Sequence, residues 1–201
     1  MTADALETGS VEEAKRTRVL DGAMKVVLAY GYHRTTMDDI ARAAEMSRPA
    51  LYLLFRNKAD IYRAIAGRMF EQCTRHIAEV LAGPGTLGER LASAIEFKMI
   101  DMMCPIETSP HGAELLDLKG QLAGDLVETW KKALAQLFCD AITAETRRTH
   151  VVLKERGLCA EMLAEFLVDG LEGMKMRAPD MERQRNAVGQ LVRVIELAIK
   201  P

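Results

Sequence analysis

The sequence predicts an all-α protein in which an N-terminal three-helix unit precedes a larger helical body. Apolar residues recur at helical spacing along most of the 201 residues. We find no strand-like run of alternating Val, Ile, Thr or aromatic residues between turn residues. Apolar residues make up 49% of the chain, enough for a hydrophobic core. We expect a disordered arm over 1–11, the three-helix unit over 12–57 and the helical body over 58–201.

The first two helices are predicted from a stop signal and a cap. Helical periodicity favours a helix over 12–30, and Gly31 is a suitable residue for its C-terminal end. Thr36 then predicts the start of a short helix over 37–44, because its hydroxyl can accept a backbone N–H of the first turn. The acidic residues that follow Thr36 are favoured there by the helix dipole.

A second cap predicts the third helix. Ser47 can cap a helix over 48–55, and Pro49 falls in its first turn, where a missing N–H costs little. Asn57 begins a long fourth helix over 58–81. Three short helices, with a three-residue turn between the second and third, have the dimensions of a helix-turn-helix.

Further helical patterns fill the body, with Gly and Pro residues between them. After a Gly- and Pro-rich loop we expect helices over 89–103, 121–156, 160–177 and 180–200, with another helix start at Ser109.

Charge and cysteine content restrict the class of protein. The net charge is −2, but residues 12–66 carry ten Lys and Arg against seven Asp and Glu. A mildly basic segment suits contact with nucleic acid. Because we find neither a secretory signal nor a membrane span, we expect a cytoplasmic protein with no membrane partner. The scattered cysteines form no CxxC pair, so we expect no metal and no cofactor.

The third helix has an inner and an outer face. Leu51 and Phe55 lie four residues apart and are expected to pack with Ile40 and Ala41 in a small core. The outer, N-terminal surface then consists of Arg48, Pro49, Ala50, Tyr52 and Leu53. In a helix-turn-helix, this part of the recognition helix meets base edges in the major groove of DNA.

These residues carry a resemblance to a known family. The run TTMDDIARAAEMSRPALYLLFRNKADIYRAI, residues 35–65, follows a helix ending in AYGY and resembles the DNA-binding domain of the TetR (tetracycline-repressor-like) family. The resemblance implies a transcriptional regulator rather than an enzyme, which binds a palindromic operator in double-stranded DNA as a homodimer. It also implies that Thr36 and Lys58 meet phosphates and that Tyr52 contacts the DNA backbone.

Within the recognition helix, Arg48 is the candidate base reader, and a solvated or phosphate-bound arginine is the equal alternative. Its planar guanidinium can donate to O6 and N7 of guanine together, which contributes about 1 to 3 kcal/mol of discrimination. Ala50 and Leu53 could pack against thymine methyl groups. The full expected DNA-contacting set is Thr36, Ser47, Arg48, Pro49, Ala50, Tyr52, Leu53 and Lys58.

Two positions depart from the family pattern. Glu45 stands in the turn where the family usually has Gly, and a left-handed backbone there would cost about 1 to 2 kcal/mol. Leu53 and Leu54 stand where polar or aromatic residues are common. We therefore expect a recognition helix with fewer hydrogen bonds and more dependence on apolar contacts or DNA shape.

The body is expected to bind a small apolar effector and to dimerise. Its helices could enclose a pocket whose candidate lining residues are Phe97, Met99, Met103, Trp130, Leu134 and Phe138. The last two helices carry apolar stripes that could form a four-helix bundle across a two-fold axis. The candidate dimer-interface residues are Leu163, Phe166, Leu167, Gly170, Leu171, Val188, Leu191, Val192, Ile195 and Ile199.

Alternative functions remain at this point. Met99, Met102, Met103, Cys104 and His111 could form a soft-metal or thiol sensor on the same DNA-binding unit, although methionines at helical spacing more often fill a core. An all-helical enzyme is a further alternative, but we find no catalytic motif among the scattered histidines and acidic residues. The leading hypothesis is a repressor that leaves its operator when an apolar effector binds.

Overall fold

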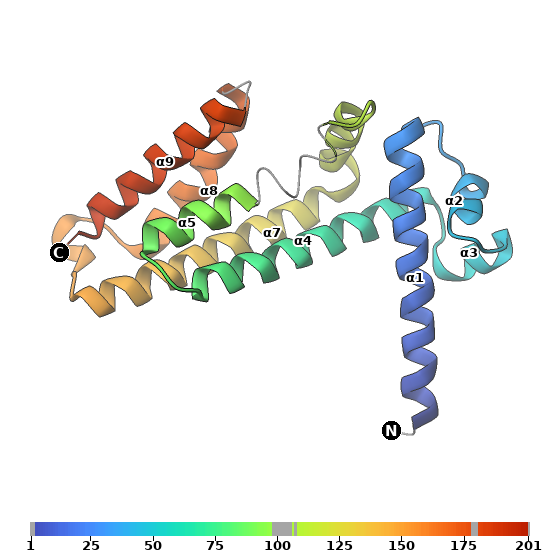
Figure 1. Cartoon of the computed structure of the whole chain (residues 1–201), viewed down its shortest axis with the longest axis horizontal. Coiled ribbons are helices and arrows are strands. Elements are labelled where there is room, and N and C mark those ends of the chain that lie inside the picture. The colour runs from blue at the N-terminus through green and yellow to red at the C-terminus, as the bar shows by residue number, and fades with distance from the viewer. Residues whose placement is uncertain (1–2, 98–105, 107, 178–180, 201) are drawn as a thin grey trace. The chain divides into compact units, whose positions relative to one another are not determined.

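A computed structural model of the chain describes residues 3–97, 106, 108–177 and 181–200. Every regular element in this part of the chain is a helix, which confirms the predicted all-α class (Figure 1). The chain divides into two compact units, the first from residues 1–69 and 105–127 and the second from 70–104 and 128–201. The first unit is therefore larger than the three-helix segment expected over 12–57.

The first unit begins with a helix longer than the sequence suggested. Its helices are α1 (Ala3–Tyr30), α2 (Met37–Ala43), α3 (Arg48–Leu54) and the first turns of α4 (Lys58–Ala82). The structure gives residues from Ala3 onward to α1, whereas the sequence predicted a disordered arm over 1–11 and a helix from residue 12. Ala, Leu and Glu dominate residues 3–7, and these residue types have high helix propensity without needing an apolar stripe.

The core of the helix-turn-helix joins α1 to α4. It is formed by the buried side chains Val19, Leu20, Ala23, Ile40, Ala41, Ala44, Leu51, Phe55, Ile61 and Ile65. The predicted inward face of α3 is confirmed, since Leu51 and Phe55 are both almost fully buried. The helices α1 and α2 approach closely at Gly22, where a Cβ atom would lie 2.9 Å from the carbonyl carbon of Ala43.

A second apolar cluster explains why residues beyond 105 belong to the first unit. Val27 and Tyr32 pack with Leu115 and Leu118 from the start of α7 (Gly112–Thr149). Polar contacts reinforce this packing. The Tyr62 hydroxyl donates to the Leu115 carbonyl at 2.7 Å, and Arg63 makes two 2.7 Å contacts with the carboxylate of Asp125.

The second unit is a helical body around one large core. It contains the rest of α4 and α7, together with α5 (Leu87–Glu96), the 3-10 helix η2 (Leu153–Arg156), α8 (Ala160–Arg177) and α9 (Met181–Ala198). The helix α9 packs against both α5 and α8. Leu134, Phe138 and Ile142 of α7 are fully buried among them.

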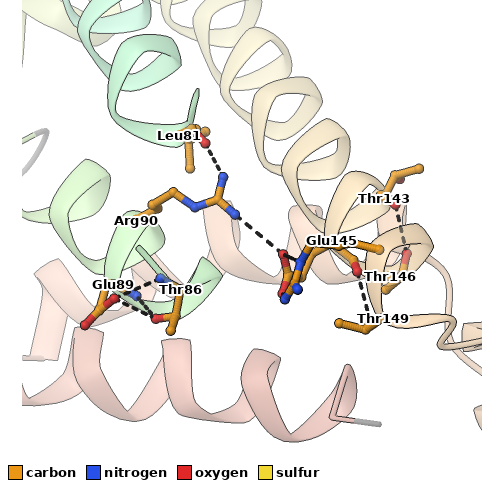
Figure 2. Close-up of polar contacts among 9 residues, drawn as sticks. Leu81, Thr86, Glu89, Arg90, Thr143, Glu145, Thr146 and Thr149 are labelled. Carbon is orange, nitrogen blue, oxygen red and sulfur yellow. Dashed lines mark hydrogen bonds and ion pairs between the residues drawn. The ribbon is translucent and has the colours of Figure 1, made fainter. Parts of the chain in front are cut away.

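Polar side chains fix the start of α5 within this unit (Figure 2). Thr86 and Glu89 form a capping box, so the helix starts at Leu87, two residues before the predicted position. Arg90 donates to the Leu81 carbonyl at the end of α4 and lies 3.6 Å from the carboxylate of Glu145 on α7. Both charged side chains are mostly buried.

The helix α7 differs from its prediction at both ends. It starts at Gly112, three residues after the helix start predicted at Ser109, whereas its end lies before the predicted one. It bends at Ala123, close to the second start predicted at 121, where a φ of −136° and a ψ of 21° are not helical. It ends at Thr149, whereas the prediction extended it to 156. His150 then adopts a left-handed φ of 58°, and the predicted stop, Gly157, ends the 3-10 helix η2 instead. Because apolar residues continue at helical spacing beyond Thr149, the sequence pattern did not show that α7 ends there.

No helix among the described residues is long and apolar enough to cross a membrane.

Candidate nucleic-acid interface

The turn between α2 and α3 has an unusual backbone conformation at Glu45. Its φ is 52°, in the left-handed region that favours glycine. Glu45 therefore has the left-handed backbone that was considered for this position. The turn closes in spite of this, because the Met46 amide donates to the Ala41 carbonyl at 3.0 Å and the Glu45 amide donates to the Arg42 carbonyl at 3.1 Å.

Both predicted caps of the helix-turn-helix are present. The Thr36 hydroxyl accepts from the Asp39 amide at 3.2 Å, and the Thr36 amide donates to the Asp39 carboxylate at 3.0 Å, which completes a capping box. The Thr36 hydroxyl also donates to this carboxylate at 2.6 Å. These hydrogen bonds, foremost that from the Thr36 hydroxyl, lower the pKa of Asp39. The Ser47 hydroxyl accepts from the Ala50 amide at 3.3 Å and keeps its own proton available for another acceptor.

The N-terminal part of α3 presents its outer face to solvent. Arg48, Pro49, Tyr52 and Leu53 are exposed, and Ala50 is half-buried. Leu53 is 88% exposed, an unusual position for a large apolar side chain with no internal role. The predicted outer face is thus reproduced by the structure.

Arg48 is held in place by a neighbour on each side. Its guanidinium lies 3.2 Å from the carboxylate of Asp38 and 5.6 Å from the centre of the Tyr52 ring. Hydrogen bonding to Tyr52, followed by the charge of Asp38, raises the pKa of Arg48. The side chain is therefore a fixed cation at the start of the recognition helix, and it remains mostly exposed.

Lys58 has a different environment from the one expected of a phosphate anchor. Its ammonium donates to the carbonyls of Tyr32 at 2.9 Å, His33 at 3.3 Å and Thr35 at 3.2 Å, and it lies over the Tyr32 ring. An ammonium group has three N–H donors, so all of them are used within the chain. In this structure Lys58 fixes the α1–α2 loop to the start of α4, and the phosphate contact expected of it stays a prediction.

Sequence reasoning missed two arginines near this surface. A groove on the first unit is lined by Val26, Tyr30, Arg34, Thr35, Asp39, Arg42 and Ala43. Arg34 and Arg42 are exposed there, and Arg42 pairs with Asp39. The signal that could have found them is position, since both lie within eight residues of Thr36 on the same side of the turn.

Comparison with known proteins identifies this arrangement. Residues 19–65 match the family described as "Bacterial regulatory proteins, tetR family". The chain is also 30% identical over 97 residues to an uncharacterized HTH-type transcriptional regulator, TtgW of Pseudomonas putida, a match that spans 48% of this chain and 69% of that protein. The chain belongs to the TetR family. It is accordingly a transcriptional regulator and not an enzyme.

Two longer matches to transcriptional regulators extend beyond the helix-turn-helix. The HTH-type transcriptional repressor ComR of Escherichia coli is 25% identical over 193 residues, covering 89% of this chain and 88% of ComR. The crystal structure of a transcriptional regulator from Cytophaga hutchinsonii has a TM-score of 0.69 at 18% identity, covering 90% of this chain and 95% of that one. Some curated relatives match over less than half of their length, such as FasR of Mycolicibacterium smegmatis at 38%.

The candidate pocket residues of this TetR-family chain lie in the core of the second unit. Trp130, Leu134 and Phe138 are buried, and Phe97 is partly buried against the same cluster. The Phe70 ring stacks on Trp130 with 4.6 Å between ring centres. Met99 and Met103 lie outside the described residues.

The candidate dimer-interface residues are mostly internal, which corrects the prediction. Within the described part of α8 and α9, eight of the ten are buried in the core of their own chain, and Gly170 is half-buried against Leu191. Phe166 is 50% exposed. The exposed apolar face instead comprises Met162, Phe166, Val194 and Leu197. The apolar residues of α8 and α9 do recur at helical spacing, but they form the faces that pack inside their own chain.

The residues proposed for a metal or thiol sensor are only partly described. Met99, Met102, Met103 and Cys104 lie outside the described residues, and His111 lies 3.8 Å from the carboxylate of Glu114. Among the described residues, no group of three His, Cys, Asp or Glu side chains could hold a metal ion. Among the described residues, the cysteines Cys73, Cys139 and Cys159 form no disulfide.

Proposed function

We propose that this regulator is a homodimeric repressor that binds a palindromic operator and leaves it when a small apolar molecule binds. The observation that carries the DNA-binding part is the fixed, exposed guanidinium of Arg48 at the N-terminal end of α3. The name of ComR, a repressor that matches most of the chain, supports repression over activation.

The roles of the DNA-contacting residues follow from their surroundings. Arg48 reads a guanine, because its fork can donate to O6 and N7 together once it exchanges Asp38 for the base. Ser47 and Tyr52 are exposed, and their hydroxyls can donate to phosphate oxygens. Thr36 brings the N-terminal end of α2 to a phosphate, where backbone N–H groups and the helix dipole favour an anion.

The remaining members of the expected set act without hydrogen bonds to DNA. Pro49, Ala50 and Leu53 offer apolar contacts to thymine methyl groups at the exposed end of α3. Lys58 acts by positioning, because its ammonium holds the loop that leads to Thr36. The operator should therefore depend on one strong polar contact and on several apolar ones.

Dimerisation is proposed through the exposed apolar face of α8 and α9. Phe166 and Val194 line a groove on these two helices, and Met162 and Leu197 extend the apolar surface beside it. Large apolar side chains that remain exposed in one chain mark an interaction surface. A two-fold dimer would place two recognition helices on successive major-groove faces, about 34 to 36 Å apart or a multiple of this distance.

The effector is proposed to bind among apolar side chains of the second unit, where Phe97, Trp130, Leu134 and Phe138 belong to or border one core cluster. Trp130 is the single tryptophan of the chain, so its emission reports on this region. By linkage, an effector that weakens operator binding must bind the DNA complex more weakly by the same factor.

The DNA-binding proposal is tested with duplexes selected from a random pool by the purified dimer. Arg48→Ala should weaken binding to the selected duplex by about 1 to 3 kcal/mol and relax the preference at one base pair per half-site. Arg148→Ala is the matched control, because Arg148 is also exposed and ion-paired but lies in the second unit. An equal loss on every sequence would show that Arg48 contacts phosphate only, and no loss at all would contradict its role.

A further inference from the structure

The first unit contains a cavity that the proposed function does not use. Its volume is about 50 Å³, and its wall is formed by side chains of α1, α2, α4, the α1–α2 loop, Ile106 and α7. Ile40 and Ile61 come from the helix-turn-helix core, whereas Val27 and Leu115 come from the neighbouring cluster at the start of α7. The cavity therefore lies where two apolar clusters of the same unit meet without filling the space between them.

Three polar side chains on the wall, those of Thr35, Tyr62 and Lys58, have already committed their protons. The Thr35 hydroxyl donates to the Gly31 carbonyl at 2.7 Å, and the Tyr62 hydroxyl donates to the Leu115 carbonyl at 2.7 Å. The Lys58 ammonium uses its three donors on the carbonyls of the α1–α2 loop. Thr35 and Tyr62 retain acceptor capacity on their oxygens, but none of these three groups has a proton left to bind an anion.

The charge state of the wall also disfavours a cationic occupant. Burial raises the pKa of Tyr62 to about 12 and raises that of Tyr32, so both phenols are neutral near pH 7. Among the described lining residues, the one formal charge is the ammonium of Lys58. It repels a cation, and its hydrogen bonds to carbonyls leave no donor for an anion. An uncharged molecule is not repelled by the Lys58 ammonium and needs no donor from it.

The size of the cavity limits the occupant. A single water needs about 10 to 15 Å³ on this measure, so about 50 Å³ exceeds what one water requires. Apolar cavities stay dry and bind small apolar molecules or xenon. Met24 and Met69 both lie on the wall, and flexible thioether side chains can move to admit a larger molecule such as a single ring.

We propose that this cavity in the DNA-binding unit is a binding site for a small, uncharged, apolar molecule, formed by residues other than those of the candidate pocket around Trp130. The site adjoins the helix-turn-helix directly, because Thr35 and Ile40 are part of its wall. Any effect of such a molecule on operator binding rests on the proposed function, whereas binding itself does not.

The first test uses xenon as a probe in crystals of the full chain. We expect a xenon peak enclosed by Val27, Ile61 and Met69 in the first unit. Absence of a peak at that place under a pressure that fills other apolar cavities would overturn the proposal. Since this measurement needs neither a variant nor DNA, its failure is distinguishable from a failure of the proposed repressor function.

The second test compares benzene with benzoate, a charged molecule of similar shape. Benzene should bind the wild-type dimer and benzoate should not. Ala66→Val, which extends a side chain into the cavity, should weaken benzene binding about tenfold or more. Gly67→Ala is the control on the same helix, because no atom lies within 4 Å of the added Cβ, and it should leave benzene affinity unchanged.

The emission of Trp130 distinguishes binding at this site from binding in the candidate pocket of the second unit. Benzene binding that Ala66→Val weakens should leave the emission of Trp130 unaltered, since all described residues of the cavity wall belong to the first unit. Benzene binding that changes the emission of Trp130 and is insensitive to Ala66→Val would overturn the proposal. Binding of benzoate with equal affinity would overturn the assignment to an uncharged ligand.

Discussion

The helix-turn-helix and the α8–α9 pair both show regular apolar periodicity, yet the sequence assigned the faces correctly in only one of them. In α3, Leu51 and Phe55 pack inward while Arg48 and Leu53 face solvent, as predicted. In α8, the stripe assigned to a partner chain, such as Leu167, is fully buried within its own chain. Periodicity therefore identifies an apolar face but does not identify what covers it.

The difference arises from local signals that are present in one region and not in the other. Thr36 and Ser47 cap their helices, and with the turn at Glu45 they fix the rotation of α2 and α3 relative to each other. In α8 and α9 the side that points inward is set by α5 and α7, which are distant in sequence.

The largest expected effect is on the free energy of unfolding, and it distinguishes the buried side of α8 from the exposed side. Leu167→Ala should reduce the free energy of unfolding by about 2 to 5 kcal/mol, because it leaves a cavity in the core of the second unit. The neighbouring Phe166→Ala should instead raise the dissociation constant of the dimer, since Phe166 is 50% exposed. Denaturant unfolding at fixed protomer concentration and sedimentation velocity measure the two effects. Unchanged dimerisation in Phe166→Ala would contradict the assigned interface.

The next effect tests the close approach of α1 and α2. Gly22→Ala should destabilise the chain by about 1 to 3 kcal/mol, because the new Cβ would lie 2.9 Å from backbone atoms of Ala43 that cannot move independently. Gly67→Ala is the control within α4, where the methyl group meets no atom within 4 Å, and it should stabilise by about 1 kcal/mol. Chemical denaturation measures both values, and a stabilising Gly22→Ala would disprove the close packing.

A smaller effect concerns the turn of the helix-turn-helix. Glu45→Gly should stabilise the chain by about 0.5 to 1 kcal/mol, because relief of the left-handed strain exceeds the added entropy of glycine in the unfolded chain. Glu45→Ala removes the same charge but keeps the Cβ atom, so it should give little gain. Equal unfolding midpoints for the two variants would show that the backbone at this position is not strained.

The smallest effect is the acid dependence of the Arg63–Asp125 pair. Arg63 lowers the pKa of Asp125 from 3.8 to about 2. A lowered pKa in the folded state means that the stabilisation is fully present above about pH 4 and is lost as the pH falls toward 2. Wild type should therefore lose slightly more stability over this interval than Asp125→Asn. Because Asp125 is exposed, the difference should be small and should shrink at high salt.

The loss of stability between pH 4 and pH 2 is measured from unfolding curves recorded at these two pH values. Arg63→Gln removes the partner that lowers the pKa, so this variant should show the reduced pH dependence of Asp125→Asn. A full wild-type dependence in Arg63→Gln would assign the lowered pKa to another group.

The sequence by itself determined the local features of this protein. The caps at Thr36 and Ser47 and the inward face at Leu51 each depend on neighbours within a few residues, so they could be predicted from spacing and residue type. The left-handed backbone at Glu45 was suggested only by the glycine that the TetR family usually has there.

Only the tertiary structure decided the features that depend on residues far apart in the chain. Lys58 meets carbonyls 23 to 26 residues away, Leu167 is covered by other helices, and the cavity is enclosed by side chains from Ala23 to Leu115. The physical reason is that a helix specifies the direction of its side chains, whereas the groups that satisfy or cover them come from packing between elements.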